Sequence, residues 1–320
     1  MSKSNPHRAA RLRRLPQPTQ AAPLRTSKAP LFEIEQNAPN VHTVRFGNVR
    51  SGWEQWVLLS SDRHHDSAFC DQGFERQHLE VARARGALVL DFGDLFDAMQ
   101  GKDDRRQSKE ELRNENKRRD YLDSLVTTAA EFYGPYAVHF GLLGLGNHES
   151  SVLDKHGTNL TSLLAHRLRS EYGCPGYAGG YGGWVRFMFV IHKTVQAQIR
   201  LKYFHGAGGG GPVTRGVIQS NRQAVYLPDA DIVVNGHTHD AWHVPIARER
   251  LTDLGVQHHD LQHHVRTATY KDEYRDGSEG WHVERGGAPK PIGAVWMRLV
   301  YAHPHRIECE FTQALRMPQG

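Results

Sequence analysis

Four short apolar runs recur along the chain, and each is continuous rather than alternating with polar residues. Continuous runs of this length are typical of strands that are buried on both faces of a sheet. Two later runs indicate a strand pair, and two more lie near the C-terminus. The four buried runs are residues 56–59, 87–90, 137–143 and 231–234; the pair is 184–191 and 198–204, and the last two are 294–301 and 306–311.

Apolar residues at helical spacing lie between these runs. The strongest stripe covers residues 122–133, a shorter one covers 160–168, and a weaker one covers 74–82. Strands that alternate with helices predict an α/β fold with a largely parallel sheet. Residues 241–310 favour mostly short strands and turns, so we expect a second sheet packed on the first.

Composition places few restrictions on this picture. A hydrophobic fraction of 38% beside 23% charged residues is ordinary for a globular protein. No apolar run approaches the roughly 20 residues that cross a bilayer, so we expect no membrane span. Cys70, Cys174 and Cys309 are far apart, odd in number and outside any C-x-x-C pattern. They predict no disulfide framework, which favours a reducing compartment and hence the cytoplasm.

The positive charge is concentrated at the N-terminus. Residues 1–28 contain seven Lys or Arg and no acid, so residues 29–320 carry a net −2 within the total of +5. Prolines are interspersed among these basic residues, which predicts a disordered tail over residues 1–30 and a single domain over 31–320. The tail is either solvated without a specific role or a contact to nucleic acid.

Residue types that bind metal ions follow each of the four buried runs. In an extended segment, residues two apart point to the same side, as Asp62 and His64 would, and likewise His237 and His239. Ligand sites in open α/β sheets lie beyond the carboxyl ends of the strands. We therefore expect these groups to converge at one edge. The side chains are Asp62, His64, Asp94, Asn147, His148, Glu149, His237 and His239.

Six of these side chains, all but His148 and Glu149, make seven candidate ligands together with His205. Imidazole and carboxylate without thiolate suit Mn²⁺, with Fe, Zn or Ni as alternatives. Seven ligands exceed the need of one ion, whereas two ions that share a carboxylate use them all. Paired ions about 3.5–4 Å apart recur in hydrolases of phosphate esters. The set predicts two divalent cations and phosphoryl transfer to water. The candidate ligands are Asp62, His64, Asp94, Asn147, His205, His237 and His239.

These residues resemble the five ordered motifs of the calcineurin-like metallophosphoesterases, over roughly residues 55–240. The motifs are Asp62-x-His64, Gly93-Asp94, Gly146-Asn147-His148-Glu149, His205 and Gly236-His237-x-His239. The resemblance implies a four-layer αββα sandwich of two mixed β-sheets flanked by helices. It also implies in-line attack by a metal-bridging hydroxide.

Residue roles follow from the same resemblance. One metal would be held by Asp62, His64 and His239, the other by Asn147, His205 and His237, with Asp94 bridging the two. His148 would lie beside the bound phosphate, where it stabilises the transition state or protonates the leaving oxygen. Glu149 would orient a neighbouring residue.

Several assignments stay open. His192 also closes a strand-like run and is the alternative to His205. Arg63 either meets a substrate phosphate or pairs with a nearby acid. Asp97 is interpreted as a helix-start residue that contacts the ligands from behind. Four further histidines are interpreted as surface residues: His258, His259, His263 and His264.

The leading function is a metal-dependent phosphodiesterase that acts on DNA, RNA or nucleotides as a single-strand or end nuclease. Residues 93–97, Gly-Asp-Leu-Phe-Asp, are similar to a run in the repair exonucleases of the family, although those carry Asp where this chain has Glu149. The same segment departs from the protein Ser/Thr phosphatase pattern. The body also resembles phage-borne phosphoesterases, and the basic tail suits a phosphate backbone.

Two other functions are considered. A phosphomonoesterase or nucleotide phosphatase would use the same metals in a narrower pocket. A non-catalytic nucleic-acid binding protein would keep the metals for stability alone. His148 speaks against the latter, because a structural metal needs no acid for a leaving group.

Overall fold

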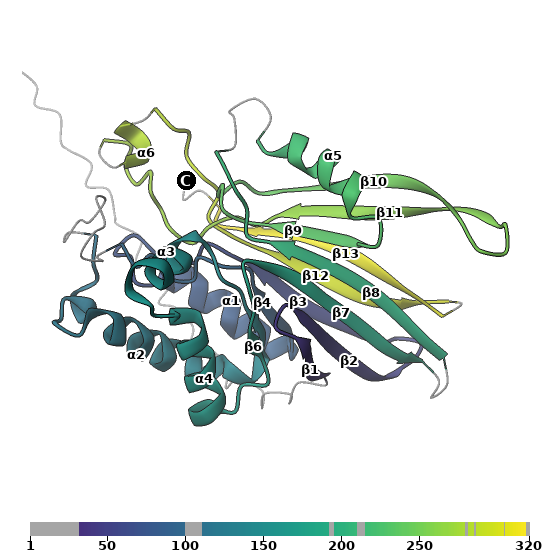
Figure 1. Ribbon diagram of the computed structural model, residues 1–320, viewed down its shortest axis with the longest axis horizontal. Helices are drawn as coiled ribbons and strands as arrows, with labels where there is room; N and C mark the ends of the chain where they lie inside the picture. The colour runs from purple at the N-terminus through teal and green to yellow at the C-terminus, as the bar shows by residue number, and fades with distance from the viewer. Residues whose placement is uncertain are drawn as a thin grey trace, which may run out of the picture.

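The computed structural model describes residues 32–99, 111–191, 195–209, 215–278, 281–284, 286–303 and 305–317, so the predicted tail over 1–30 lies outside the described residues. Two mixed sheets form its centre (Figure 1). Their strand orders are β1-β2-β7-β8-β9-β11-β10 and β13-β12-β3-β4-β5-β6. The predicted α/β class with two mixed sheets is confirmed.

The strands of the seven-stranded sheet are β1 (Phe32–Ala38), β2 (Val41–Val49), β7 (Gly182–Ile191), β8 (Val195–Phe204), β9 (Ile232–Asn235), β10 (Trp242–Leu251) and β11 (Gln257–Arg266). Those of the six-stranded sheet are β3 (Glu54–Ser60), β4 (Leu88–Asp91), β5 (Phe140–Leu143), β6 (Tyr177–Ala178), β12 (Gly293–Ala302) and β13 (Arg306–Leu315). The helices are α1 (Gln72–Arg85), α2 (Tyr121–Tyr133), α3 (Asn147–His156), α4 (Leu160–Tyr172), α5 (Val217–Tyr226) and α6 (Trp281–Glu284), with 3₁₀ turns η1 (Asn114–Asn116) and η2 (Gly134–His139).

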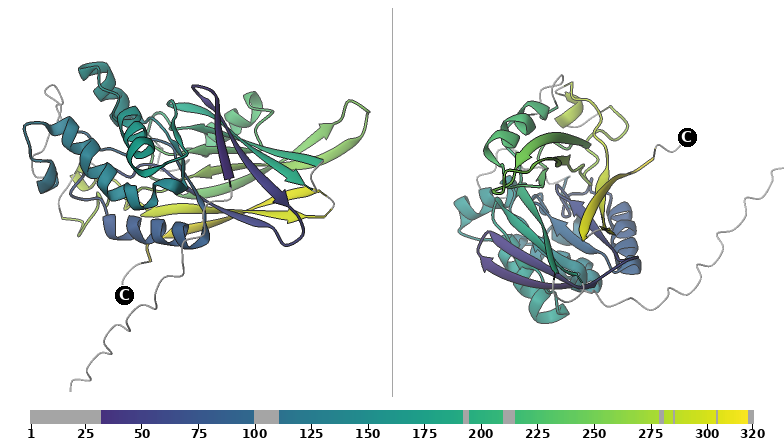
Figure 2. Two further views of the ribbon diagram at one scale, coloured as in Figure 1. Left: turned by 90° about the horizontal axis from the view of Figure 1, so that it is seen from below. Right: turned by 90° about the vertical axis from the view of Figure 1, so that its right-hand side faces the viewer.

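Two apolar cores explain why the central runs are continuous. Val57 and Leu59 of β3 face the seven-stranded sheet and pack in the core between the sheets, whereas Leu58 faces the helices. Successive residues of a strand point to opposite faces, so a strand covered on both sides needs apolar residues throughout. Helices α1, α2 and α4 form the cover on the outer side of the six-stranded sheet (Figure 2).

The other outer face has a thinner cover. Helix α5 lies over β11, where Gln262 donates to the carbonyl oxygens of Leu227 at 2.9 Å and Ala230 at 2.8 Å. Ser220 and Gln223 are the buried residues of α5. The sandwich thus has helices on both sides, in unequal amounts. None of the helices in the described ranges has the length and apolar character to span a bilayer.

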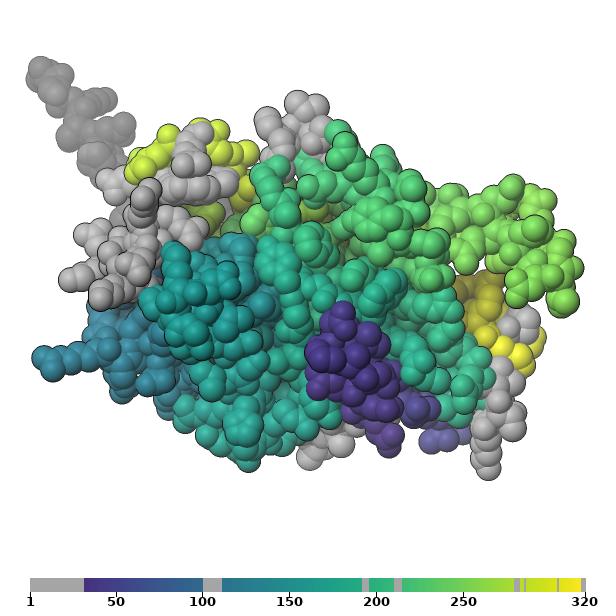
Figure 3. All heavy atoms as spheres, in the orientation of Figure 1, coloured from purple at the N-terminus to yellow at the C-terminus, as the bar shows by residue number. Residues whose placement is uncertain are grey.

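Some sequence expectations were wrong. The run 137–143 is divided between η2 and β5, because Gly134 and Pro135 begin a 3₁₀ turn. Residues 241–310 contain three ten-residue strands, β10, β11 and β12, instead of mostly short ones. Strands β10 and β11 pair along their whole length. Their far ends project from the body as a hairpin (Figures 1 and 3). Strands β1 and β2 and helix α3 were not predicted.

The four histidines interpreted as surface residues lie on β11 and do not share one environment. His258 and His259 are exposed, whereas His264 is buried and lies 3.0 Å from the Gln262 side-chain oxygen. His263 is half-buried and stacks with His243 of β10. Alternate residues of a strand face opposite sides, and α5 covers the side that carries His264. The surface interpretation was therefore wrong for His264.

Candidate metal centre

The loops that follow five strands of the two sheets converge at one end of the sandwich. The main-chain N–H of Asp62 donates to Gly93 at 2.9 Å, and that of His64 donates to Asp94 at 3.0 Å, which joins the loops after β3 and β4. The N–H of Gly236 donates to His205 at 2.8 Å and joins the loops after β8 and β9. Carboxyl ends of strands from both sheets thus contribute to one site.

Left-handed backbone directs the candidate ligands into this site. The sequence favoured extended segments, but five of the seven ligands have positive φ values, which is a correction. For residues other than glycine this conformation is uncommon and costs of order 1–3 kcal/mol each. Such backbone strain is concentrated where function constrains the chain. The residues and their φ values are Asp62 (52°), His64 (44°), Asp94 (54°), His237 (71°) and His239 (57°).

Two glycines are required by the close packing of these loops. A Cβ atom at Gly146 would collide with the Asp94 carboxylate, and one at Gly236 would collide with Ser61 and Asp62. The glycines that precede the Asn147 and His237 motifs therefore allow one ligand loop to lie directly against another.

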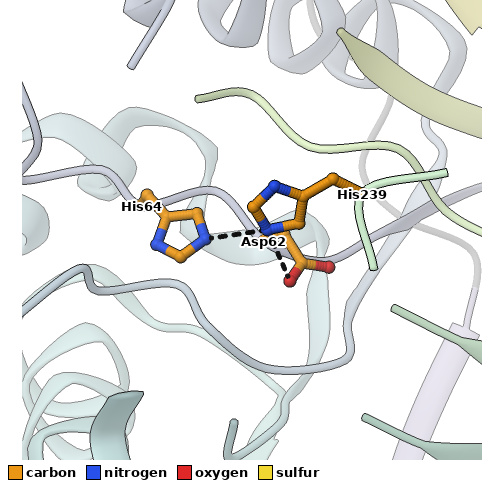
Figure 4. Close-up of side chains that lie close together, drawn as sticks. All are labelled: Asp62, His64 and His239. Carbon is orange, nitrogen blue, oxygen red and sulfur yellow. Dashed lines mark hydrogen bonds and ion pairs between the residues drawn. The ribbon is translucent and has the colours of Figure 1, made fainter. Parts of the chain in front are cut away.

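Asp62, His64 and His239 form what we call the first cluster (Figure 4). His239 Nε2 lies 3.4 Å from Asp62 Oδ1 and 3.3 Å from His64 Nε2. Asp62 is fully buried, whereas the His239 side chain retains 12% exposure. The dashed lines in Figure 4 show that His239 stands between the other two side chains.

Asp94, Asn147, His205 and His237 form the second cluster. His205 Nε2 lies 3.0 Å from Asp94 Oδ2 and 3.1 Å from Asn147 Oδ1. His237 Nδ1 lies 2.7 Å from the same Asn147 oxygen. His205 is the candidate that takes this place; His192, the alternative, lies outside the described residues.

The two clusters adjoin each other. His205 Nε2 of the second cluster lies 3.9 Å from Asp62 Oδ1 of the first. Potential ligand atoms of Asp94 lie within 4.8 Å of those of His205 and His237, and also of those of His64 and His148. Asp94 therefore occupies the position between the clusters that a bridging carboxylate needs.

The hydrogen-bond chemistry of these side chains suits a cation. His205 Nδ1 lies 3.1 Å from the carbonyl oxygen of Phe92, which can only accept, so Nδ1 carries the proton. In the neutral ring the Nε2 lone pair then faces the oxygens of Asp94 and Asn147, which are acceptors as well. His64 repeats the pattern, with Nδ1 2.9 Å from Asp97 Oδ1 and Nε2 directed into the first cluster. Ligating histidines in proteins are commonly held in this way.

Electrostatics also indicate a site that lacks positive charge. Burial alone would raise the pKa of Asp62, but the hydrogen bond and charge of His239, together with the charge of His205, lower it to about 2. Burial would lower the pKa of His205, yet the nearby Asp94 and Asp62 carboxylates raise it to about 10. Cations that bind here would displace protons from the imidazoles.

His148 lies at the edge of both clusters with its side chain 12% exposed. Its Nδ1 donates to the Asp97 carbonyl oxygen at 2.5 Å, and its Nε2 lies 3.9 Å from Asp94 Oδ2. Its main-chain N–H donates to Asp94 Oδ1 at 2.9 Å. The fixed Nδ1–H leaves Nε2 as the nitrogen that can exchange a proton with a bound molecule.

Glu149 is fully buried at the start of α3, and its carboxylate joins the loops after β4 and β5. It accepts the main-chain N–H groups of Gly146 at 2.9 Å, Asp94 at 3.1 Å and Phe96 at 2.8 Å. These contacts fix the backbone of Asp94 rather than a side chain.

Arg63 points away from the clusters and is fully buried. It forms ion pairs with Glu75 at 2.7 Å and Asp91 at 2.8 Å, which corresponds to pairing with nearby acids rather than to a contact with substrate. The same cation lies over the Tyr133 ring at 5.6 Å. Its position behind Asp62 and His64 anchors the first ligand loop.

Asp97 does not begin a helix, which corrects that expectation. The Asp66 carboxylate accepts the main-chain N–H groups of Asp97 at 2.6 Å and Ala98 at 3.0 Å, and this fixes a loop. The expected contact with a ligand is present, because Asp97 Oδ1 lies 2.9 Å from His64 Nδ1.

Sequence reasoning missed Lys271 and Glu273, which follow β11. Lys271 Nζ lies 2.9 Å from Asp97 Oδ1, and Glu273 Oε2 lies 3.7 Å from His239 Nδ1. Neither residue belongs to a recognisable motif, and only the folded chain places them beside the first cluster.

No protein family and no curated protein matches the sequence. Among solved structures, the chain is similar to the Vps29 protein of Entamoeba histolytica complexed with zinc, at 11% identity and a TM-score of 0.32, covering 81% of this chain and 99% of that one. A predicted phosphoesterase from Streptococcus pneumoniae matches at 11% identity and a TM-score of 0.30, over 82% and 100%. GAP50, the anchor in the inner membrane complex of Plasmodium, matches at 11% and 0.39, over 81% and 84%.

At such low identities and TM-scores, these matches carry no inference about activity, substrate or partners. What this chain can do chemically depends on its own site.

Proposed function

We propose that this protein is a binuclear metal-dependent phosphoester hydrolase. The observation that carries the proposal is the pair of adjoining clusters, in which imidazole nitrogens and carboxylate oxygens converge within 4.8 Å of one another. Asp62, His64 and His239 would hold one cation; Asn147, His205 and His237 would hold the other. Asp94 would contact both.

Each group of the site has a distinct part in this proposal. Divalent cations, best supplied as Mn²⁺, polarise phosphoryl oxygens and activate water at neutral pH. His148 Nε2 stands at the exposed edge, where it would give a proton to the leaving oxygen. Its Nδ1–H bond to the Asp97 carbonyl keeps the ring in this orientation. Glu149 keeps the Asp94 backbone in place.

For the substrate, we propose a phosphodiester of nucleic acid or nucleotides. The Gly93–Asp97 run and the basic N-terminal residues support this class, and a phosphomonoester is the competing substrate. The three cysteines, Cys70, Cys174 and Cys309, are all free thiols, which supports a reducing cytoplasmic location.

The test uses metal-stripped protein, with and without added Mn²⁺, on a generic phosphodiester, a phosphomonoester and labelled single-stranded DNA. We expect hydrolysis that depends on Mn²⁺. It should be lost in Asp94→Asn and persist in the control Asp154→Asn. Asp154 is an exposed residue of α3, so this control makes the same chemical change outside the site. Hydrolysis that ignores both metal and Asp94 would reject the proposal.

The relative rates then identify the substrate class. Faster diester and DNA hydrolysis supports the nuclease assignment. Preference for the monoester replaces it with a phosphatase. Tight metal binding without hydrolysis of any of the three substrates would favour a binding protein that keeps its metals for stability.

A further inference from the structure

A segment distant in sequence from every motif runs along the first ligand loop. This strap, residues 267–273, directly follows β11. The Thr267 and Ser61 hydroxyls lie 2.6 Å apart. The carbonyl oxygen of Asp62 accepts both the Thr269 hydroxyl at 2.7 Å and the Tyr270 N–H at 3.0 Å. The backbone that turns Asp62 into the site is therefore held by the strap.

Lys271 is the charged centre of the strap. Its side chain is only 7% exposed, and its ammonium lies 2.9 Å from Asp97 Oδ1 and 3.4 Å from Glu273 Oε1. A buried ammonium is costly unless it is paired with hydrogen-bonding acceptors. The folded chain meets this condition with two carboxylates, and each of them faces a histidine of the first cluster.

These contacts form a continuous chain around the first cluster. Asp97 Oδ1, which Lys271 contacts, also lies 2.9 Å from His64 Nδ1. Glu273, the second partner of Lys271, has its Oε2 3.7 Å from His239 Nδ1. The Lys271 ammonium thus connects two carboxylates, those of Asp97 and Glu273. Each carboxylate faces the Nδ1 atom of a histidine whose Nε2 points into the first cluster. Carboxylates behind ligating histidines set ring orientation and tautomer.

We propose that Lys271 is a positioning residue for the first cluster, where it holds Asp97 behind His64 and Glu273 behind His239. The inference rests on the proposed metal-binding function. It implies that the site has a sixth component besides the five motifs. It also implies asymmetry, because in the second cluster the Nδ1 of His205 faces the main-chain carbonyl oxygen of Phe92 rather than a carboxylate.

Calorimetric titration of the metal-stripped full chain with Mn²⁺ tests this inference without reference to activity. In wild-type protein we expect two binding events. Lys271→Met should weaken one of them by about 10–100-fold, the usual effect of removing support behind a ligand, and leave the other unchanged. The matched control is Lys202→Met, since Lys202 is a half-buried lysine of β8 whose ammonium lies over the ring of Trp184 on β7. It should leave both events unchanged.

A double variant separates positioning from general damage. If Lys271 acts through Asp97, Lys271→Met should add little to the loss of Mn²⁺ affinity already caused by Asp97→Asn. The effects of substitutions within one network of contacts do not add. Full additivity, or equal weakening of both binding events, would overturn the proposal. Should Lys271→Met fail to fold, Glu273→Gln removes the charge behind His239 and is expected to weaken the same event. Wild-type protein that binds no Mn²⁺ would contradict the proposed function itself.

Discussion

The two clusters contain similar ligands but are supported in different ways. In the first cluster, His64 and His239 face the carboxylates of Asp97 and Glu273, and Lys271 joins these two acids. In the second cluster, His205 is fully buried, and its Nδ1 faces the main-chain carbonyl oxygen of Phe92 in the loop after β4. Side-chain charges, two of them on the distant strap, stand behind the histidines of the first cluster, whereas a backbone carbonyl stands behind His205 of the second.

The two clusters should therefore respond differently to substitutions around them. A main-chain carbonyl cannot be removed by mutation, whereas each of the charges behind the first cluster can. We therefore expect the second cluster to tolerate changes around it better than the first, and we expect changes in shared residues to affect both.

The largest effect is expected for Asp94→Asn, which alters the carboxylate between the clusters. Metal ions contribute several kcal/mol to such reactions, so loss of their shared ligand should lower kcat/KM on the order of 10³-fold. Steady-state kinetics at saturating Mn²⁺ measures it, with Asp154→Asn as control. Activity within a factor of ten of wild type would mean that Asp94 does not join the clusters.

His148→Ala should come next, because it removes a proton donor from the site without removing a ligand. General acid groups typically contribute 10²–10⁴-fold, and we expect a fall in kcat of about 10²-fold with both Mn²⁺ binding events retained. His166→Ala, an exposed histidine of α4, is the control. A large loss of bound metal in His148→Ala would instead identify His148 as a ligand.

Single-ligand variants test the division into two clusters. His239→Ala should weaken one Mn²⁺ binding event in calorimetry, by about 100-fold or more, and His237→Ala should weaken the other. The double variant should lose both. If either single variant abolishes both events, the clusters do not bind independently.

A prediction about stability rather than catalysis concerns the anchor behind the first ligand loop. Burial would raise the pKa of Glu75, but His65 and Arg63 lower it to about 2. A carboxylate whose pKa is lower in the folded protein than in the unfolded chain stabilises the fold at pH values above the unfolded pKa, near 4.5. This contribution is lost as the pH falls toward 2. Glu75→Gln should therefore flatten the fall in stability between pH 5 and pH 3, as measured by urea unfolding of metal-free protein.

At pH 7 the same variant should be less stable by about 3 kcal/mol, because it leaves Arg63 with one buried acid fewer. Glu80→Gln, at a partly exposed carboxylate on the same helix, should change stability by less than about 1 kcal/mol. If the stability of Glu75→Gln falls between pH 5 and pH 3 as steeply as that of wild type, the Glu75 ion pair makes no pH-dependent contribution to stability.

Much of the fold could be predicted because β3, β4 and β9 are buried on both faces and need apolar residues throughout. Strand β2 was missed because polar residues such as His42 and Thr43 are buried in it. The length of β10 and β11 was missed because much of the hairpin is exposed, so its sequence carries charged residues and no clear core pattern.

The candidate ligands could be predicted because each follows a strand at a short, motif-like spacing. The left-handed backbone of Asp62 and His64 could not, since no residue pattern specifies it and only contacts from other loops impose it. The roles of Lys271 and Glu273 could not be predicted either, because no residue pattern specifies which side chains they contact. Their place beside the first cluster depends on where β11 ends in the folded sandwich.

The central claim is that two cations lie side by side at these clusters. Anomalous diffraction from crystals of the protein grown with Mn²⁺ tests it most directly, with data collected on both sides of the manganese absorption edge. We predict two peaks about 3.5–4 Å apart, one between Asp62, His64 and His239 and the other between Asn147, His205 and His237, with Asp94 touching both. A single peak, or peaks elsewhere on the chain, would contradict the account.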